Sequence, residues 1–338
     1  MTPPPVVLVT GSSTGGIGAS LSEAFAARGC IVYATARRLD SLQRLEHSIQ
    51  GVTGDDSSKP VAGTGVVKKF RLDVTSEDSV QEAVKEIITA EGRIDILVNN
   101  AGIHCIGPVL DVSTKEAEAA FQTNVISVMR MQSAIVPHMA TQRSGLVINI
   151  GSITAIAPIP FAGVYAATKA ALRSITETLY LECKPFNVDV MLIEAGGVRS
   201  NLSQNAAPRY NIPEKSLYKS YLSKIIGRMH ASQSPGAMDT DEFARAVVSK
   251  ALPKREVYTL AAVTPLNNDP GAAAGITTNP TAVVFPKRYG TPARYLSIGS
   301  SALSFWIMSW LPRGFFLNLL WKKAQAFRPP PGVEVPEL

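Results

Sequence analysis

The chain of 338 residues contains little cysteine: Cys30, Cys105 and Cys183 lie far apart and form no CxxC pair. An odd number of distant cysteines argues against a disulfide framework and against a zinc site, and we predict no metal site. Free cysteines also fit a reducing compartment. Charged residues are also sparse, at 18% against 46% hydrophobic residues. That balance excludes an intrinsically disordered chain and provides enough apolar material for a core.

Basic tracts with interleaved aromatic residues are missing, so the net charge of +6 does not indicate a nucleic-acid-binding protein. The modest excess instead suits anionic small molecules or anionic lipids. The N-terminal sequence lacks a charged segment followed by an apolar one, and we therefore predict no secretory signal. These absences together favour a protein on the cytoplasmic side of the cell's membranes.

Apolar runs of strand length alternate with longer segments of helical period, a pattern typical of a parallel sheet with helices on both faces. We expect strands at 6–9, 31–35, 66–72, 94–98, 146–150 and 188–193. We expect helices at 17–28, 39–48, 76–91, 113–139 and 163–182. Six such alternations predict a doubly wound, Rossmann-type α/β fold.

A glycine-rich string, Thr10-Gly-Ser-Ser-Thr-Gly-Gly-Ile-Gly18, follows the first strand and opens the first helix. Glycines let the backbone approach a pyrophosphate, and the helix N-terminus offers free N–H groups and a partial positive charge. An ordinary tight turn is the alternative, but the strand before and the helix after favour a dinucleotide site. The expected contacts are Gly11, Ser13, Gly16, Ile17 and Gly18.

The second strand ends in Ala34-Thr-Ala-Arg-Arg38, where NAD-binding folds usually carry an acid for the ribose 2′-hydroxyl. Arg37 and Arg38 would instead pair with a 2′-phosphate through charge-assisted contacts, which favours NADPH/NADP+ as the cofactor. A solvated helix start is the alternative interpretation of these arginines.

The fourth strand ends in Asn99-Asn-Ala-Gly102, small and amide residues at the edge where such sheets bind ligands. Turn chemistry alone would also explain this string. Together with the glycine loop, it predicts that Asn100, Ala101 and Gly102 border the adenosine and the nicotinamide.

Tyr165 and Lys169 are four residues apart and therefore share one face of the predicted helix 163–182. An ammonium near a phenol stabilises the tyrosinate, so we expect Lys169 to lower the pKa of Tyr165 from about 10 toward neutrality. Such a phenol serves as a general acid or base. A tyrosine and lysine at this spacing are more often a surface pair, and only the surrounding motifs favour catalysis.

The motifs Thr10–Gly18, Asp73, Asn99–Gly102, Asn124, Ser152 and Tyr165–Lys169 follow one another as in the short-chain dehydrogenase/reductase family, which the chain resembles over about residues 5–255. The resemblance implies that Tyr165 transfers the substrate proton and that Lys169 holds the nicotinamide ribose and lowers the tyrosine's pKa. It implies that Ser152 hydrogen-bonds the carbonyl oxygen and that Asn124 holds a water of the proton relay. As a bare serine, Ser152 would more often be a helix cap.

The same resemblance implies further cofactor contacts at Asp73, Val74, Gly197, Val198 and Ser200. For Asp73, an N-terminal helix cap is an alternative. The chain departs from the family pattern in two places. The glycine loop is one residue longer than usual, with Gly15 before Gly16, and Gly196 stands where the family usually has proline, which we expect to loosen the segment over the cofactor.

Within the family, the sequence is similar to fungal acyl-dihydroxyacetone-phosphate reductases and to reductases of secondary metabolism. The likeness implies NADPH-dependent interconversion of a ketone and a secondary alcohol, on a lipid-like or a polyketide- or terpenoid-like substrate. It also implies a homo-oligomer. A non-catalytic NADP(H)-binding redox sensor and a membrane-surface scaffold are the alternatives.

The C-terminal part carries all three tryptophans, and 295–311 has no charged residue and about the minimum length of a membrane span. Aromatic residues next to Lys322 and Lys323 suit peripheral contact with a membrane, such as the endoplasmic reticulum or a lipid droplet. A lid over an apolar substrate and a subunit contact are the alternatives. We divide the chain into a catalytic domain (1–260) with a lid (201–230), a loop or disordered insertion (261–291) and a hydrophobic extension (292–338).

Overall fold

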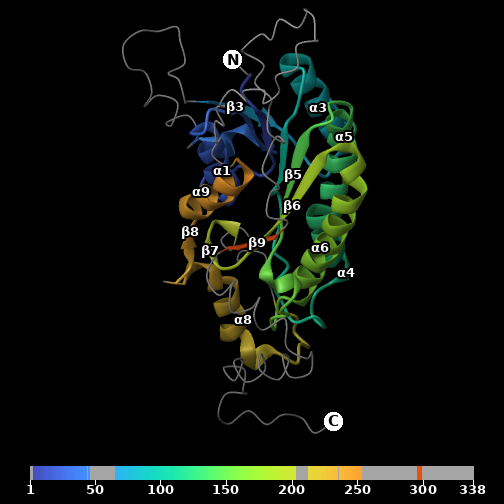
Figure 1. Cartoon of the computed structure of the whole chain (residues 1–338). Helices are drawn as coiled ribbons and strands as arrows, with labels where there is room; N and C mark the ends of the chain where they lie inside the picture. The colour runs from blue at the N-terminus through green and yellow to red at the C-terminus, as the bar shows by residue number, and fades with distance from the viewer. Residues whose placement is uncertain are drawn as a thin grey trace, which may run out of the picture.

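The computed structural model describes residues 3–43, 45, 65–202, 212–234, 236–252 and 295–298. Its centre is a parallel sheet with the strand order β3-β2-β1-β4-β5-β6-β9 (Figure 1). The strands are β1 (Val6–Val9), β2 (Ile31–Ala36), β3 (Val66–Arg71), β4 (Ile96–Asn99), β5 (Gly145–Ile150), β6 (Val188–Ala195) and β9 (Tyr295–Ile298). The first six confirm the predicted doubly wound, Rossmann-type fold.

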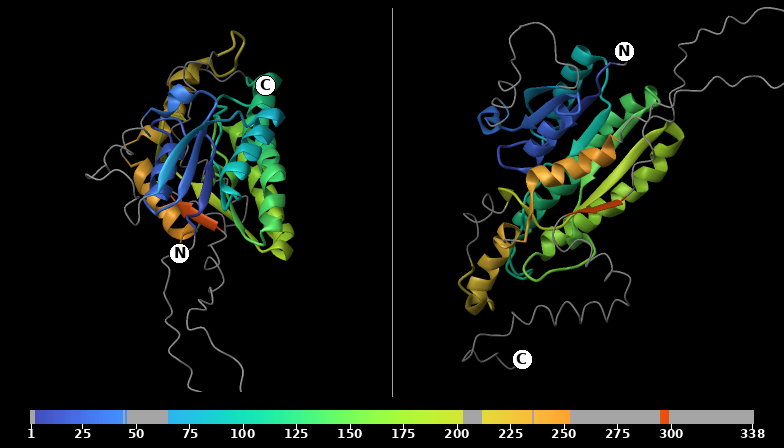
Figure 2. Two further views of the ribbon diagram at one scale, coloured as in Figure 1. Left: turned by 90° about the horizontal axis from the view of Figure 1, so that it is seen from above. Right: turned by 60° about the vertical axis from the view of Figure 1, so that its left-hand side comes forward.

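Helices cover the two faces of the sheet as separate groups (Figures 1 and 2). On one face lie α1 (Ile17–Ala26) and α9 (Thr240–Ala251). On the other lie α3 (Glu77–Glu91), α5 (Ser127–Thr141) and α6 (Gly163–Cys183), with α4 (Thr114–Phe121) before them in the chain. The apolar strand residues are buried on both sides, which is why the strands have continuous rather than alternating hydrophobic sequences.

The strand order reverses at β1, which pairs with β2 on one side and with β4 on the other. Chain connections leave this point in opposite directions, so a crevice opens beyond the carboxyl ends of β1 and β4. Both the glycine loop after Val9 and the segment after Asn99 lie at this edge. The fold therefore brings together two motifs that are about ninety residues apart in the sequence.

Two predicted helices differ from the structure. The expected helix 39–48 begins as a single 3-10 turn, Leu39–Leu42, and most of its later residues lie outside the described part. The expected helix 113–139 contains a π-helical turn, Gln122–Ile126, between α4 and α5. A π turn accommodates one extra residue and often marks a functional site, and this one carries Asn124.

The seventh strand was not predicted. Tyr295–Ile298 belong to the apolar stretch that the sequence analysis assigned to the extension, yet they pair in parallel with Leu192–Ala195 of β6, and Ile298 is buried in the core. A helical span that begins at residue 295 is therefore wrong. A four-residue strand inside a longer apolar run has no distinguishing period. The strand with which it pairs also lies about a hundred residues away in the sequence.

Beyond the sheet, β7 (Val198–Arg199) pairs with β8 (Met238–Asp239), and α8 (Leu222–Met229) lies in the predicted lid. Among the described residues, no helix has the length and apolar character needed to cross a membrane. The insertion 261–291 and the C-terminal extension apart from β9 lie outside the described residues, and their assignments stay predictions.

Candidate active site

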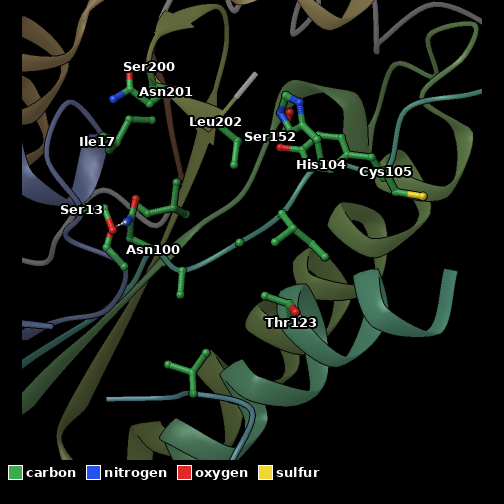
Figure 3. Close-up of a pocket in the computed structure, with 18 of the residues that line it drawn as sticks. Ser13, Ile17, Asn100, His104, Cys105, Thr123, Ser152, Ser200, Asn201 and Leu202 are labelled. Carbon is green, nitrogen blue, oxygen red and sulfur yellow. Dashed lines mark hydrogen bonds between the residues drawn. The ribbon is translucent and has the colours of Figure 1, made fainter. Parts of the chain in front are cut away.

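A cavity of about 850 Å³ lies at the carboxyl edge of the sheet, bordered by the loops that follow β1, β2, β4, β5 and β6 (Figure 3). Most of the predicted site residues line it: Gly11, Ser13, Gly16, Ile17, Arg37, Arg38, Asp73, Val74, Asn100, Ala101, Gly102, Ser152, Tyr165, Lys169, Val198 and Ser200. Gly18, Asn124 and Gly197 do not line it. The structure thus places the motifs around one space, while their individual roles stay predictions.

The glycine loop is packed too closely to accept side chains. Gly11 has φ +71°, and a Cβ there would lie 2.8 Å from the Cα of Ala101. A Cβ on Gly18 would lie 2.4 Å from the carbonyl oxygen of Gly11. The amide of Asn100 donates to the carbonyls of Thr10 and Gly11, both at 2.9 Å, and so fixes this loop to the end of β4.

The additional glycine of this loop faces the start of the lid. Gly15 has φ +76°, and a Cβ on it would lie 2.3 Å from Nδ2 of Asn201. That same Nδ2 donates to the carbonyl of Thr14 at 2.9 Å. The extra residue therefore creates a contact between the glycine loop and the lid, a contact that the sequence analysis did not predict.

Arg37 and Arg38 are exposed at the end of β2, and both line the cavity. Arg38 forms a loose surface pair with Asp40, Nε to Oδ1 3.7 Å, which contributes little to stability. Asp73 lies beside them, after β3: burial would raise the pKa of its carboxyl, but hydrogen bonds from Thr75 and the charges of Arg37 and Arg130 outweigh this and lower that pKa. This edge of the cavity therefore presents guanidinium groups to a ligand.

The alternative interpretation of Asp73 as a helix cap is wrong. Ser76 is the N-cap of α3, since its hydroxyl accepts the backbone N–H of Ser79 at 3.3 Å. The carboxylate of Asp73 instead accepts from the backbone and the hydroxyl of Thr75. Asp73 is thus held in a tight turn at the cavity wall.

Ser152 and Tyr165 lie together at the far end of the cavity. The Oγ of Ser152 accepts from the backbone N–H and the hydroxyl of Thr154, at 3.2 and 3.0 Å. Its own proton is therefore available to the Tyr165 hydroxyl, which lies near enough for Ser152 to lower its pKa, or to a substrate oxygen. Ser152 is also the cap of the following 3-10 turn, which confirms the cap interpretation, while its contact with a carbonyl oxygen stays a prediction.

Burial governs the protonation of the tyrosine and the lysine. It raises the pKa of Tyr165 to about 12, although the hydrogen bond from Ser152 opposes this, and it lowers the pKa of Lys169 to about 8. The Nζ of Lys169 lies 5.8 Å from the phenol ring centre and donates to the carbonyl of Ile150 at 2.8 Å. The expected lowering of the phenol pKa by Lys169 is therefore not found, because desolvation outweighs the distant ammonium.

Asn124 is fully buried in the π-helical turn. Its Oδ1 accepts from the backbone N–H of Ile103 at 2.8 Å, and its Nδ2 donates to the carbonyl of Ile103 at 2.9 Å. The same Nδ2 also donates to the hydroxyl of Thr168 at 3.1 Å. These bonds occupy the side chain and fix the segment after β4 to α6. Its role in holding a relay water stays a prediction.

The proline-to-glycine departure has a structural reason. The backbone N–H of Gly196 donates to the carbonyl of Ile298 at 2.6 Å, which extends the pairing of β6 with β9. A proline has no N–H and would leave this carbonyl unpaired. Nearby, the carbonyl of Gly197 accepts from the backbone of Met238, so the segment is held by the small β7–β8 pair.

His104 and Cys105, which belong to none of the predicted motifs, follow the Asn99–Gly102 string and line the cavity beside Ser152 (Figure 3). The ring of His104 meets that of Tyr165 edge to face, with centroids 4.8 Å apart. Burial raises the pKa of the Cys105 thiol to about 11, as does the charge of Glu116, so the thiol stays protonated. Only their position two and three residues beyond the motif could have drawn attention to them.

Residues 5–211 match the short chain dehydrogenase family. The short-chain dehydrogenase ptmH of Penicillium ochrochloron is 34% identical over 251 residues, which are 74% of this chain and 85% of that protein. The chain belongs to the short-chain dehydrogenase/reductase family. As a member it is an oxidoreductase, and a nicotinamide dinucleotide is the cofactor typical of such enzymes.

Two further likenesses extend the comparison of this short-chain dehydrogenase/reductase. The NADPH-dependent 1-acyldihydroxyacetone phosphate reductase of Schizosaccharomyces pombe is 31% identical over 258 residues, 75% of this chain and 80% of that protein. The crystal structure of a short-chain dehydrogenase from Streptomyces avermitilis gives a TM-score of 0.67 at 24% identity and covers 97% of this chain and 100% of that chain. The latter comparison shows the fold.

The geometry fits the dinucleotide of a short-chain dehydrogenase/reductase. Glycines at 11 and 18 leave space where any Cβ would collide with backbone, and α1 begins directly after Gly16 with N–H groups toward the cavity edge. Arg37, Arg38 and Asp73 provide charged groups at the β2 side, and Lys169 provides one near Ser152. The glycine loop would hold the pyrophosphate. Arg37, Arg38 and Asp73 would hold the adenosine, and Lys169 the nicotinamide ribose.

Proposed function

We propose that the protein is an NADPH-dependent carbonyl reductase that interconverts a ketone and a secondary alcohol on a lipid-like or polyketide- or terpenoid-like substrate. The observation that carries the proposal is the juxtaposition of Ser152 and Tyr165 at one end of the cavity whose other end carries Arg37 and Arg38. A non-catalytic sensor would have no need of a buried phenol and hydroxyl at that position.

When bound, the reduced nicotinamide supplies a hydride to the carbonyl carbon. The Tyr165 hydroxyl donates its proton to the carbonyl oxygen, and its raised pKa keeps that proton on the phenol at neutral pH. Ser152 donates a hydrogen bond to the same oxygen and stabilises the negative charge that develops there. Lys169, with its pKa lowered to about 8, can carry a proton toward Tyr165 after the transfer.

Three considerations support NADPH over NADH. No acidic residue ends β2, and two arginines stand there instead. Guanidinium groups bind phosphates through bidentate, charge-assisted contacts. The Schizosaccharomyces pombe relative carries NADPH dependence in its name.

The proposed function is tested by following NADPH oxidation with a panel of aliphatic, cyclic and aromatic ketones. Turnover of at least one ketone with NADPH, and at least tenfold poorer use of NADH, is the expected result. Tight NADPH binding without oxidation by any ketone would instead favour the redox sensor.

For the whole protein we propose a homo-oligomer with peripheral membrane contact on the cytoplasmic side, at the endoplasmic reticulum or a lipid droplet. The support is the aromatic and basic composition of the 292–338 extension, excluding the strand β9. The catalytic domain, 1–260, then gains its last strand from that extension.

A further inference from the structure

His104 is a partly buried imidazole with no hydrogen bond in the described part of the chain. Its Nδ1 is buried without a partner, and no ion pair or hydrogen bond holds its other nitrogen. A buried polar atom that stays unpaired costs about 1–3 kcal/mol. Nδ1 is sealed from the cavity, so the nitrogen that a ligand in the cavity can reach is Nε2, which has no protein partner among the described residues either.

The position of His104 relative to the reacting groups is well defined. Its ring packs edge to face on Tyr165, and both line the cavity with Ser152, so the three side chains converge on one end of it. The preceding residue, Ile103, is fixed by the amide of Asn124 in both directions. The loop that carries the imidazole is therefore held in place, while the ring itself has no polar anchor.

The imidazole is neutral at working pH. Burial lowers the pKa of His104 to about 4, and the charges of Lys169 and Arg228 add to this effect. A neutral imidazole carries one donor and one acceptor nitrogen. It can thus bond a hydroxyl or a carbonyl oxygen without contributing a charge.

We propose that His104 selects substrates that carry a second oxygen beside the ketone, such as α-hydroxyketones. This inference rests on the proposed carbonyl reduction. With the ketone oxygen between Ser152 and Tyr165, the imidazole next to the phenol ring lies beside the neighbouring carbons of the substrate. An oxygen on those carbons can bond Nε2 of His104, whereas a hydrocarbon that excludes water from this space leaves that nitrogen unpaired.

The test compares acetophenone with α-hydroxyacetophenone, which differ by one oxygen. The ratio of their kcat/KM values is measured with NADPH for the wild type and for His104→Leu, His104→Gln and Cys105→Ala. Because the intrinsic reactivity of the two ketones is the same for every variant, a change in the ratio isolates the side chain. Dissociation constants of both ketones with NADP+ present give a readout that does not depend on turnover.

We expect His104→Leu to lower the preference for the hydroxyketone about tenfold, in both kcat/KM and binding, mainly through weaker use of the hydroxyketone. His104→Gln should retain part of the preference, because the amide still offers a donor and an acceptor. Cys105→Ala, which changes the neighbouring cavity residue, should leave the ratio unchanged.

An unchanged ratio in His104→Leu would overturn the inference, and so would an equal loss in Cys105→Ala. If the wild type reduces acetophenone but the His104 variants do not change the kcat/KM ratio, this inference fails and the proposed function stands. If neither ketone, nor any other ketone, is reduced, the proposed function fails and the inference fails with it.

Discussion

At the scale of single residues, the placement of Ser152, Tyr165 and Lys169 at one cavity could be predicted from sequence, but the protonation of the tyrosine and the lysine could not. The spacing of Tyr165 and Lys169 placed both on one face of a helix, and the structure places both at the cavity. Their protonation depends on burial, which the folded chain imposes and which the spacing of two residues does not reveal. His104 shows the same limit, because its contact with Tyr165 joins segments sixty-one residues apart.

The arginines at the end of β2 give a prediction about cofactor choice. Changing Arg37 and Arg38 together to alanine removes the groups proposed to bind the 2′-phosphate. We expect the dissociation constant of NADPH to rise about 10–100-fold, which corresponds to one or two charge-assisted hydrogen bonds, while that of NADH stays within twofold. Fluorescence titration of both cofactors measures this, and equal weakening of the two would show that the arginines do not read the phosphate.

His104 also predicts how stability depends on pH. Its pKa falls from 6.5 in the unfolded chain to about 4 in the folded one, so the folded state binds fewer protons between these values. Stability therefore decreases as the pH drops through this window. The wild type should lose about 2 kcal/mol more than His104→Leu between pH 7 and pH 4.5.

Urea unfolding of both proteins at the two pH values provides this comparison. His138 lies in α5 away from the cavity, and His138→Leu serves as the matched control. Parallel loss of stability in wild type and His104→Leu would contradict the buried, neutral state of the imidazole.

At the scale of elements, long segments were predictable and short ones were not. Six strands and the helices at α1, α3 and α6 have apolar patterns of sufficient length. The π turn at Asn124 and the strand β9 depend on distant partners, Ile103 and Thr168 for the first and β6 for the second. Gly196 is an example: the reason why glycine replaces the family's usual proline is visible only once β9 is placed, because the Gly196 N–H donates to the carbonyl of Ile298.

The longer glycine loop gives a prediction at this scale. Gly15 and Gly92 both have positive φ, +76° and +73°, but only Gly15 faces another side chain, that of Asn201. Alanine at either position should cost about 1 kcal/mol of stability, because L residues are strained in this conformation. Only Gly15→Ala should also weaken NADPH binding severalfold, since the added methyl displaces the loop from Asn201.

Thermal unfolding and NADPH titration of the two variants separate strain from contact. Gly92→Ala is the matched control, because nothing lies within 4 Å of its new methyl group. Equal NADPH affinity in both variants would mean that the contact between loop and lid does not support the cofactor site.

At the scale of the whole molecule, the sheet order and the cavity at its carboxyl edge followed from the alternation of strands and helices. The boundary of the domain did not, because β9 comes from beyond residue 260. A chain ending at residue 294 lacks this strand and the buried Ile298, whereas one ending at 298 retains both.

We therefore predict that the chain ending at 294 is at least about 2 kcal/mol less stable than the chain ending at 298. In flotation with anionic phospholipid vesicles, the full chain should float with the vesicles and the chain ending at 298 should not. Both chains should reduce a soluble ketone. Equal vesicle binding by the two would place the membrane contact elsewhere in the protein.

The central claim is that the Tyr165 hydroxyl donates the proton to the reduced carbonyl, and Tyr165→Phe tests it most directly. Removing the hydroxyl leaves the ring contact with His104, so we expect NADPH to bind within threefold of wild type. Single-turnover oxidation of bound NADPH by a ketone substrate should slow by about 10²–10⁴-fold. A variant that binds NADPH and keeps near-normal turnover would contradict the mechanism.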